Sequence, residues 1–190
     1  MRLYGEMHDG AVIFEEGDAE IGSDEPHAGG LEDLYVRNAP EMMRLAFLLT
    51  RDAATAEDIA QEAFVRVAGR FRHMRSAGAF DAYLRRTVVN LCMTYHRRQR
   101  TAREYARRVG ARAERMEPRV GLPDIETRDE VRAALAQLPI RQRAAVVLRF
   151  YADLSEQQVA DALGCSVTAE RSLVFRAMET LRTRIGGDER

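Results

Sequence analysis

The chain has 190 residues, 46% of them apolar and 31% charged, with a formal net charge of −1, so it can bury the core of one ordinary domain or of two small ones. Its longest apolar runs, LAFLL and AAVVL, are far too short to cross a membrane and no signal peptide is recognisable, so we expect a cytoplasmic protein without membrane insertion. Cys92 and Cys165 belong to no CxxC pair and the four histidines are scattered, which argues against a zinc site and a disulfide framework and predicts no metal and no cofactor.

The charge is unevenly distributed along the chain. Residues 1–30 hold eight acidic residues against Arg2 alone, whereas residues 66–119 hold fifteen arginines against four acidic residues. This split indicates an acidic extension on a body that meets a polyanion. Residues 1–30 also lack hydrophobic periodicity, so we expect them to be mostly disordered, as a solvated tail or as an acidic flap that competes with nucleic acid. All 29 basic residues are arginine, a compositional bias that weakens each one as a sign of bidentate recognition.

Helical periodicity begins at Leu31. The segment LEDLYVRNAPEMMRLAFLL places apolar residues at helical spacing, and Pro40 is expected to kink or restart this helix. In the next helix, Thr55 followed by Asp58 resembles a capping box. This helix is expected to run to about residue 71, and a row of apolar residues predicts its buried face: Ile59, Ala60, Ala63, Phe64, Val67 and Phe71.

A third helix is predicted after a loop at residues 72–79. In FDAYLRRTVVNLCMTYHRRQR, apolar residues recur every three or four positions, which predicts a helix over residues 80–98. Its outer face is expected to carry Arg85, Arg86, Asn90, Arg97 and Arg98. These helices make a first domain over residues 31–100. Residues 101–126 are rich in arginine and are then broken by Pro118, Gly121 and Pro123, which predicts a flexible linker that is helical at its start.

The second domain is expected over residues 127–186. A capping box at 127–130 opens its first helix, and Pro139 ends that helix and starts another. Ser155 with Gln158 is a further capping box, and Gly164 suits the left-handed end of the short helix that follows. Ser166 caps the last helix, over about 167–185. The residues expected to face inward are Val131, Leu135, Leu138, Ile140, Ala144, Val147, Leu148, Tyr151, Val159, Ala162, Leu163, Val167, Val174, Ala177, Met178 and Leu181.

No segment has a convincing strand pattern. The predicted fold is therefore all-α, with two small helical domains joined by a flexible linker. A short helix, the turn Gly164-Cys165-Ser166 and a longer basic helix predict a helix-turn-helix in the second domain. The alternative is an ordinary helical hairpin. In a helix-turn-helix, the early residues of the second helix meet base edges, here Thr168, Ala169, Arg171, Ser172 and Arg176.

Two further groups of residues indicate binding surfaces. Asp58, Gln61 and Glu62 share one side of their helix, although a solvated face near a helix start also explains them. The arginines of helix 80–98 suit phosphates, and Tyr83, at the margin of the apolar stripe, could stack on an unpaired base. The alternative is core aromatics with arginine for solubility. No nucleophile, metal spacing or phosphate loop is recognisable, so no catalytic residue and no enzyme activity are expected.

Three segments, in order, resemble the extracytoplasmic-function sigma factors of bacterial RNA polymerase, with the pattern closest to the SigE-type group. LAFLLTRDAATAEDIAQEAFVRVAGRF is similar to their polymerase-binding segment, FDAYLRRTVVNLCMTYHRR to their promoter-melting helix, and LAQLPIRQRAAVVLRFYADLSEQQVADALGCSV to their C-terminal domain. The resemblance covers residues 31–98 and 127–185. It implies as partners the beta-prime and beta subunits of the polymerase core, promoter DNA and an anti-sigma factor.

The resemblance also implies site residues. Asp58, Gln61 and Glu62 would bind the clamp helices of beta-prime. Six residues would act at the promoter minus-10 element, where a non-template base leaves the stack: Arg75, Tyr83, Arg86, Asn90, Arg97 and Arg98. Four would read the minus-35 element as duplex: Thr168, Arg171, Ser172 and Arg176.

The sequence departs from the family pattern at several positions. Tyr83 stands where the family usually has tryptophan, and it keeps an aromatic face. The usual run close to SVGTVKSRLHRA is here SVTAERSLVFRA, in which Glu170 replaces an apolar residue, Leu173 a basic one and Phe175 a histidine. A buried Glu170 must reach water, find an arginine or become protonated. We therefore predict weak or altered minus-35 reading.

Two other interpretations remain open. One is a helix-turn-helix regulator that acts without core polymerase, although such a protein has no need for AEDIAQE and the arginine-aromatic helix. The other is a sigma-like protein whose last helix binds a protein through Leu173 and Phe175, although these two residues do not share a face.

Overall fold

The computed structural model describes residues 30–70, 76–109 and 129–185, and every regular element within these ranges is helical. Three helices form a first bundle: α1 (Leu31–Thr50), α2 (Ala53–Ala68) and α3 (Ala77–Arg108). A second bundle contains α4 (Asp129–Gln137), α5 (Ile140–Val146), the π-helical turn η2 (Val147–Tyr151), α6 (Glu156–Leu163) and α7 (Val167–Ile185). The all-α fold with a helix-turn-helix at α6 and α7 is thus confirmed.

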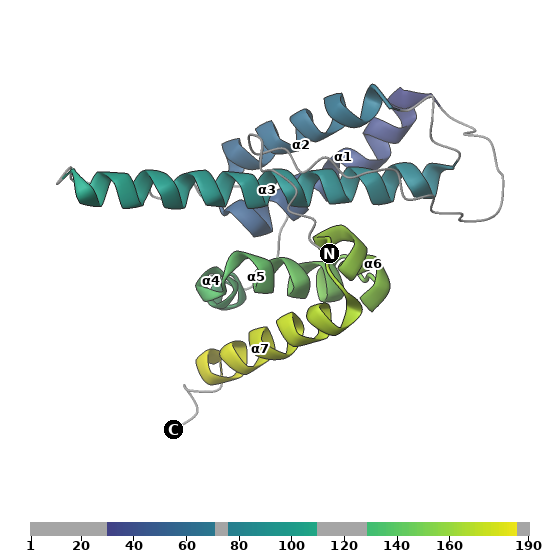
Figure 1. The fold of residues 1–190 in the computed structure, drawn as a ribbon. Coiled ribbons are helices and arrows are strands. Elements are labelled where there is room, and N and C mark those ends of the chain that lie inside the picture. Colours follow the sequence, from purple (N-terminus) through teal and green to yellow (C-terminus); the bar gives the residue numbers. More distant parts are fainter. Residues whose placement is uncertain (1–29, 71–75, 110–128, 186–190) are drawn as a thin grey trace, which may run out of the picture.

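The two bundles pack against each other. In Figure 1 the second bundle lies below the long helix α3, and α7 lies on the side away from α3. The contact runs chiefly through α5 and α6 on α3, with α5 and η2 also on α1. Buried apolar residues of both bundles form one continuous cluster, which includes Leu45, Phe64 and Phe80 of the first and Leu148 and Leu163 of the second.

The first bundle differs from expectation at its helix ends. α1 continues through Pro40 without a restart, and the exposed Pro40 lies on its outer side. α2 begins at Ala53 rather than near Thr55, because the Asp52 side chain accepts a hydrogen bond from the Thr55 amide at 2.7 Å. The predicted capping box of Thr55 and Asp58 is therefore wrong. The expected buried stripe of α2 is confirmed from Ile59 to Val67, and Phe71 lies outside the described residues.

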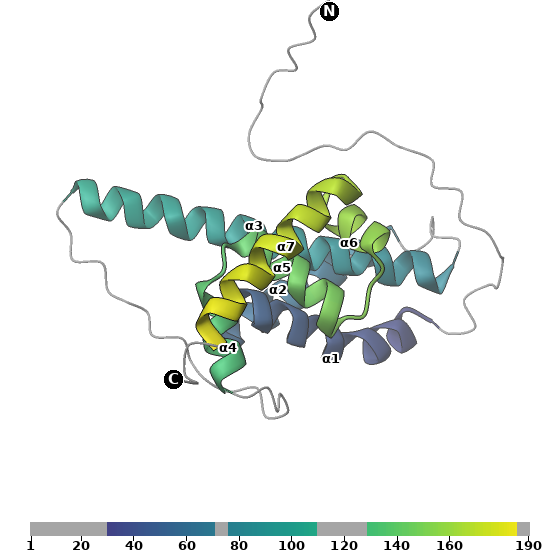
Figure 2. The same cartoon turned by 90° about the horizontal axis from the view of Figure 1, so that it is seen from below.

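Helix α3 is longer than expected at both ends. Ser76 caps it, with its hydroxyl accepting from the Ala79 amide at 3.2 Å, so the end of the predicted loop is helical. The helix continues to Arg108, into the start of the predicted linker, and its last turns extend beyond the packed body (Figures 1 and 2). The rest of that linker, up to residue 126, and the predicted capping residue Thr127 lie outside the described ranges.

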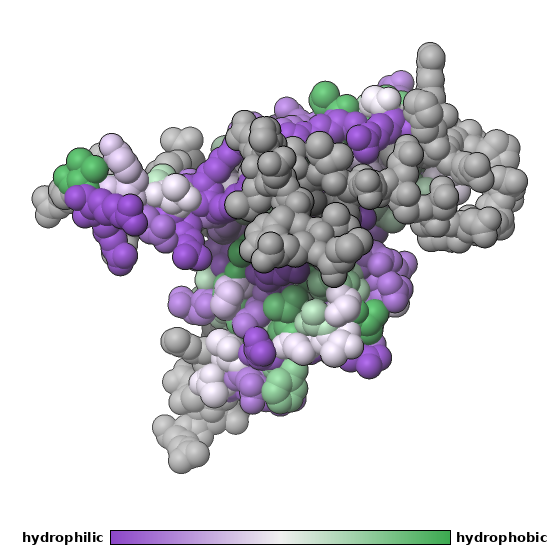
Figure 3. Space-filling model, in the orientation of Figure 1, coloured by the Kyte–Doolittle hydropathy of each residue, from purple (hydrophilic) through white to green (hydrophobic). Residues whose placement is uncertain are grey.

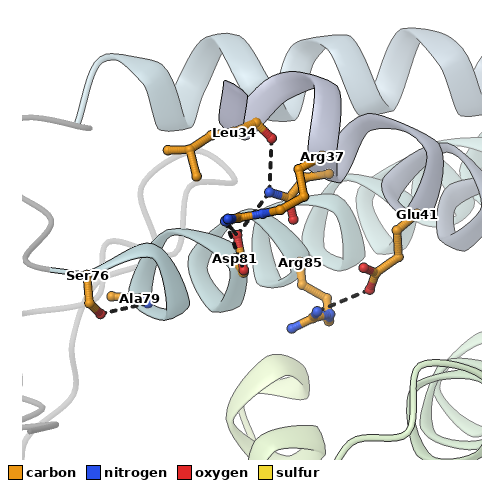
Figure 4. A network of polar contacts seen from close by, with 8 residues as sticks. Leu34, Arg37, Glu41, Ser76, Ala79, Asp81 and Arg85 are labelled. Carbon is orange, nitrogen blue, oxygen red and sulfur yellow. Dashed lines mark hydrogen bonds and ion pairs between the residues drawn. The ribbon is translucent and has the colours of Figure 1, made fainter. Parts of the chain in front are cut away.

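A partly buried polar network fixes α3 against α1 (Figure 4). Asn38 is only 3% exposed and donates to the Leu34 carbonyl at 2.9 Å and to Asp81 Oδ1 at 3.0 Å. Arg37 Nη2 donates to the same Asp81 oxygen at 3.2 Å. Arg85 pairs with Glu41 of α1 at 3.1 Å and is 15% exposed, so its expected place on the outer face of α3 is wrong. The pairing turns it toward α1 instead.

The second bundle follows its predicted caps closely. Pro139 precedes α5, Ser155 and Gln158 form the capping box of α6, and Gly164 ends α6 at φ 58° and ψ 49°. Ser166 accepts from the Ala169 amide at 3.2 Å and so caps α7. Two inward residues were predicted wrongly: Val131 is 37% exposed and Tyr151 is 43% exposed. Tyr151 ends the π-helical turn η2, and a π turn holds more residues than an α turn, which rotates Tyr151 out of the α-helical register.

Candidate nucleic-acid interface

The outer side of α2 presents the three residues predicted to bind polymerase. Asp58, Gln61 and Glu62 are all exposed, while Ile59 and Ala60 between them face the core. Glu62 pairs with Arg66 one turn later, and Gln61 donates weakly to Glu57 at 3.4 Å. Val65, which is 74% exposed, also lies on this side and was not predicted from the sequence. Its position three residues after Glu62 and four after Gln61 was the available signal, since that spacing places it on the same side.

The predicted minus-10 residues of α3 share one side of the helix. Tyr83, Arg86, Asn90 and Arg97 follow one another at intervals of three, four and seven residues, which returns them to the same side. Asn90, Arg97 and Arg98 are exposed, whereas Arg86 is half-buried and has further contacts. Arg75 lies outside the described residues. Hydrophilic side chains cover most of the extended end of α3, at the left of Figure 3.

Tyr83 lies at the margin of the core, as expected, and contacts Arg70 from the end of α2. The guanidinium of Arg70 lies 5.6 Å from the centre of the Tyr83 ring and donates to its hydroxyl. This places a cation against the tyrosine, in a cation–π arrangement. Phe80, in contrast, is fully buried and contacts Phe64, with ring centres 6.4 Å apart. Of the two aromatics, only Tyr83 is placed to meet a ligand.

Helix α7 presents its predicted readers to solvent. Thr168, Arg171, Ser172 and Arg176 are all exposed. Leu173 is half-buried and packs against the core, whereas Phe175 is 62% exposed, so the two residues do not form one apolar patch. Because α7 packs on α4, α5 and α6, its outer side faces away from the first bundle (Figure 1). That side is therefore open to a duplex.

Glu170 is buried inside this helix-turn-helix. Its side chain is 1% exposed and its Oε1 atom has no hydrogen-bond partner among the described residues. Burial raises the pKa of this carboxyl, and the nearby carboxylate of Glu156 raises it further, against the opposing charges of Arg149 and Arg171. Of the three outcomes expected for Glu170, an ion pair with Arg149 or Arg171 is not formed in the structure.

The junction of the two bundles centres on one carbonyl. The Leu49 carbonyl, at the end of α1, accepts a hydrogen bond from Arg143 Nη1 of α5 at 2.7 Å and contacts His96 Nε2 of α3 at 2.8 Å. Burial lowers the pKa of His96, and the charges of Arg143 and Arg103 lower it further, against the raising effect of the Leu49 contact. His96 is therefore neutral at pH 7 and donates from Nε2. This junction was not predicted, because it joins residues that lie far apart in the chain.

The part of the chain that the structure describes has neither a metal-binding group nor a membrane-spanning helix. Among residues 30–70, 76–109 and 129–185, no three His, Cys, Asp or Glu side chains come together in a way that could hold a metal ion. In the same ranges, no helix is both long and apolar enough to span a membrane.

Comparison with known proteins identifies both halves of the chain. The family model described as Sigma-70 region 2 matches residues 34–102, and that described as Sigma-70, region 4 matches residues 128–181. The RNA polymerase sigma-E factor of Streptomyces avermitilis is 33% identical over 161 residues, which cover 80% of this chain and 83% of that protein. The probable RNA polymerase sigma factor RfaY of Xanthomonas campestris is 32% identical over 179 residues, which cover 88% of this chain. This chain spans only 44% of the length of that protein.

A solved structure shows the same fold. The sigma factor RpoE, in its complex with the anti-sigma factor NepR from Bartonella quintana, matches with a TM-score of 0.65 at 20% identity. The match covers 83% of this chain and 98% of that one. The packed arrangement of the helices is thus shared with a solved protein.

Proposed function

Since this chain belongs to the sigma-70 family of RNA polymerase sigma factors, in the extracytoplasmic-function group, we propose that it binds core polymerase, recognises promoter minus-10 and minus-35 elements and starts transcription in the cytoplasm. It acts as a transcription initiation factor, and the polymerase core catalyses RNA synthesis. An anti-sigma factor, as in the Bartonella complex, is a further partner in this proposal.

The observation that carries the proposal is the coexistence of two different surfaces in one chain. α2 presents Asp58, Gln61 and Glu62 to solvent, and α7 presents an exposed, arginine-bearing helix after a helix-turn-helix corner. A regulator that acts on duplex DNA alone needs only the second surface. The protein-binding interpretation loses its basis because Leu173 packs against the core.

We predict that charge reversal on α2 will weaken binding to core polymerase. Glu62→Arg or Asp58→Arg places a positive charge where the proposed contact side has an exposed acid. Charges of the same sign that face each other across an interface cost several kcal/mol, so the affinity for core polymerase should fall at least about tenfold. Fluorescence anisotropy of the labelled chain, titrated with core polymerase, measures this. Glu32→Arg, at an exposed position in the first turn of α1, is the matched control and should retain affinity. Equal affinities for all variants would contradict the proposed surface.

We predict that Tyr83 contributes to promoter opening. Stacking of a base on an aromatic side chain contributes about 1–3 kcal/mol, so Tyr83→Ala should lower the extent of opening about tenfold or more. Tyr83→Trp should retain it. Opening is measured with core polymerase and a promoter that carries 2-aminopurine in its minus-10 element. Tyr105→Ala removes an aromatic side chain that is 69% exposed on the same helix, and it should have little effect. If the alanine variants at 83 and 105 open the promoter equally, Tyr83 has no such role.

A further inference from the structure

The predicted reader Arg171 is engaged by an acid of the same domain. Its Nε donates to Glu156 Oε2 at 2.8 Å, and its Nη2 lies 2.7 Å from the same oxygen. Glu156 belongs to the first turn of α6 and Arg171 to the second turn of α7, so the pair spans the helix-turn-helix corner. The hydrogen bond lowers the pKa of Glu156 and raises that of Arg171, so both groups are charged at neutral pH.

The pair lies on the open surface, where DNA would approach. The Arg171 side chain is 66% exposed and that of Glu156 is 38% exposed. A guanidinium binds a carboxylate and a phosphate through the same planar set of donors. The Glu156 carboxylate therefore occupies donors that Arg171 would otherwise offer to a phosphate or a base edge.

The other charged side chains near Arg171, those of Arg149 and Glu170, do not pair with it. Arg149, in η2, donates from Nη1 to the Leu154 carbonyl just after that turn, at 2.6 Å. Glu170 is close enough to influence the pKa of Arg171, but it is buried and no ion pair joins the two side chains. The Glu156–Arg171 pair is thus the direct ionic contact of this corner.

We propose that Glu156 is a positioning residue whose carboxylate binds the Arg171 guanidinium in the place of a DNA phosphate. Promoter DNA must then displace this carboxylate before Arg171 can read the DNA. This inference rests on the proposed role of α7 in DNA binding and adds a cause for weak reading. An exposed ion pair is weak because water screens it, so the restraint weakens binding without abolishing it. The other predicted readers, Thr168, Ser172 and Arg176, are also exposed, and none of them forms an ion pair with another described residue.

The test measures binding of the full chain to duplex DNA without polymerase. A fluorescein-labelled random-sequence duplex at low ionic strength is the probe, read by anisotropy. Glu156→Gln should bind about two- to fivefold more tightly, because it releases Arg171. The plot of log affinity against log salt should also steepen by about one unit, since one more arginine contacts phosphate.

Two comparisons separate release of Arg171 from a general gain in positive charge. Glu179→Gln makes the same charge change at an exposed position of α7 and should alter affinity less than about twofold. In an Arg171→Gln background, Glu156→Gln should have almost no effect, because the residue that it restrains is absent.

Several results would overturn the proposal. They are unchanged or weaker binding by Glu156→Gln, no duplex binding by either protein, an equal gain from Glu179→Gln, or a gain that persists without Arg171. A lower melting temperature of Glu156→Gln with unaltered binding would make the pair a structural contact only. The assay contains no polymerase, so failure of polymerase-dependent transcription would bear on the proposed function and leave this result standing.

Discussion

Replacement of Arg143 by leucine is expected to lower the free energy of unfolding by about 2–4 kcal/mol, because several buried carbonyls lose their donor at once. Arg143 is 6% exposed and donates from Nε to the Leu135 carbonyl at 2.9 Å and from Nη1 to the Leu49 carbonyl at 2.7 Å. Its Nη2 donates to the Ala136 and Leu138 carbonyls at 3.0 and 3.3 Å. One side chain thus donates hydrogen bonds to the carbonyl groups around the end of α4 and to one at the end of α1.

The Leu49 contact makes Arg143 a link between the two bundles. Burial lowers the pKa of Arg143 to about 10, with a contribution from the charge of Arg51, so the guanidinium remains charged at pH 7. In the leucine variant, the Leu49 carbonyl retains only His96, which belongs to the first bundle. We therefore expect weaker packing between the bundles as well as lower stability.

Chemical denaturation and small-angle scattering measure these two effects. Arg143→Leu should unfold at lower denaturant concentration and have a larger radius of gyration. Arg141→Leu is the matched control, since Arg141 is exposed and donates once, to the Leu163 carbonyl at 3.2 Å. Its cost should stay below about 1 kcal/mol. Equal losses from the two variants, or an unchanged radius for Arg143→Leu, would contradict the role given to Arg143.

Replacement of Glu170 by valine is expected to raise the free energy of unfolding by about 1–3 kcal/mol. The native side chain is 1% exposed with an unpartnered oxygen, and a buried polar atom without a partner costs about this much. Valine supplies apolar contacts at the same place between α7 and the helices beneath it. A valine variant less stable than the native chain in denaturant unfolding would contradict this view of Glu170.

The raised pKa of Glu170 also predicts a pH dependence of stability. The folded chain holds the Glu170 proton more tightly than the unfolded chain, whose carboxyl titrates near its ordinary value of 4.5. Above that value the folded state binds more protons than the unfolded state, so stability falls as pH rises, until the pH passes the folded pKa. Glu170→Gln removes this contribution. As the pH rises from about 4 to 7, the glutamine variant should therefore become more stable relative to the native chain.

The fold was predictable where local signals agree with packing. Pro139, the capping pair Ser155 and Gln158, and Gly164 set helix ends through backbone chemistry that acts within a few residues, and all were found as predicted. Tyr151 was misplaced because the π-helical turn changes the periodicity, and nothing in VLRFY marks that change. Thr55 was misplaced because Asp52, three residues earlier, is the stronger cap.

Most positions of the candidate interface that the structure describes were predictable as exposed, whereas Tyr83 and Arg86 are half-buried. The contacts were not predictable, because they join residues far apart in the sequence. Arg85 pairs with Glu41 across 44 positions, and Arg143 reaches Leu49 across 94. Glu170 was recognised as unusual from the sequence alone, but its burial and the pairing of Arg171 with Glu156 required the packed helices.

Run-off transcription with purified core polymerase and a promoter library is the most direct test of whether this chain starts transcription. We expect transcripts that depend on both this chain and the promoter, with an enriched minus-10 motif and a weak or altered minus-35 motif. Asp58→Arg should abolish them. If the chain adds no transcript to core polymerase alone, although it binds duplex DNA, the assignment as an initiating sigma factor is contradicted and a regulator that acts without polymerase takes its place.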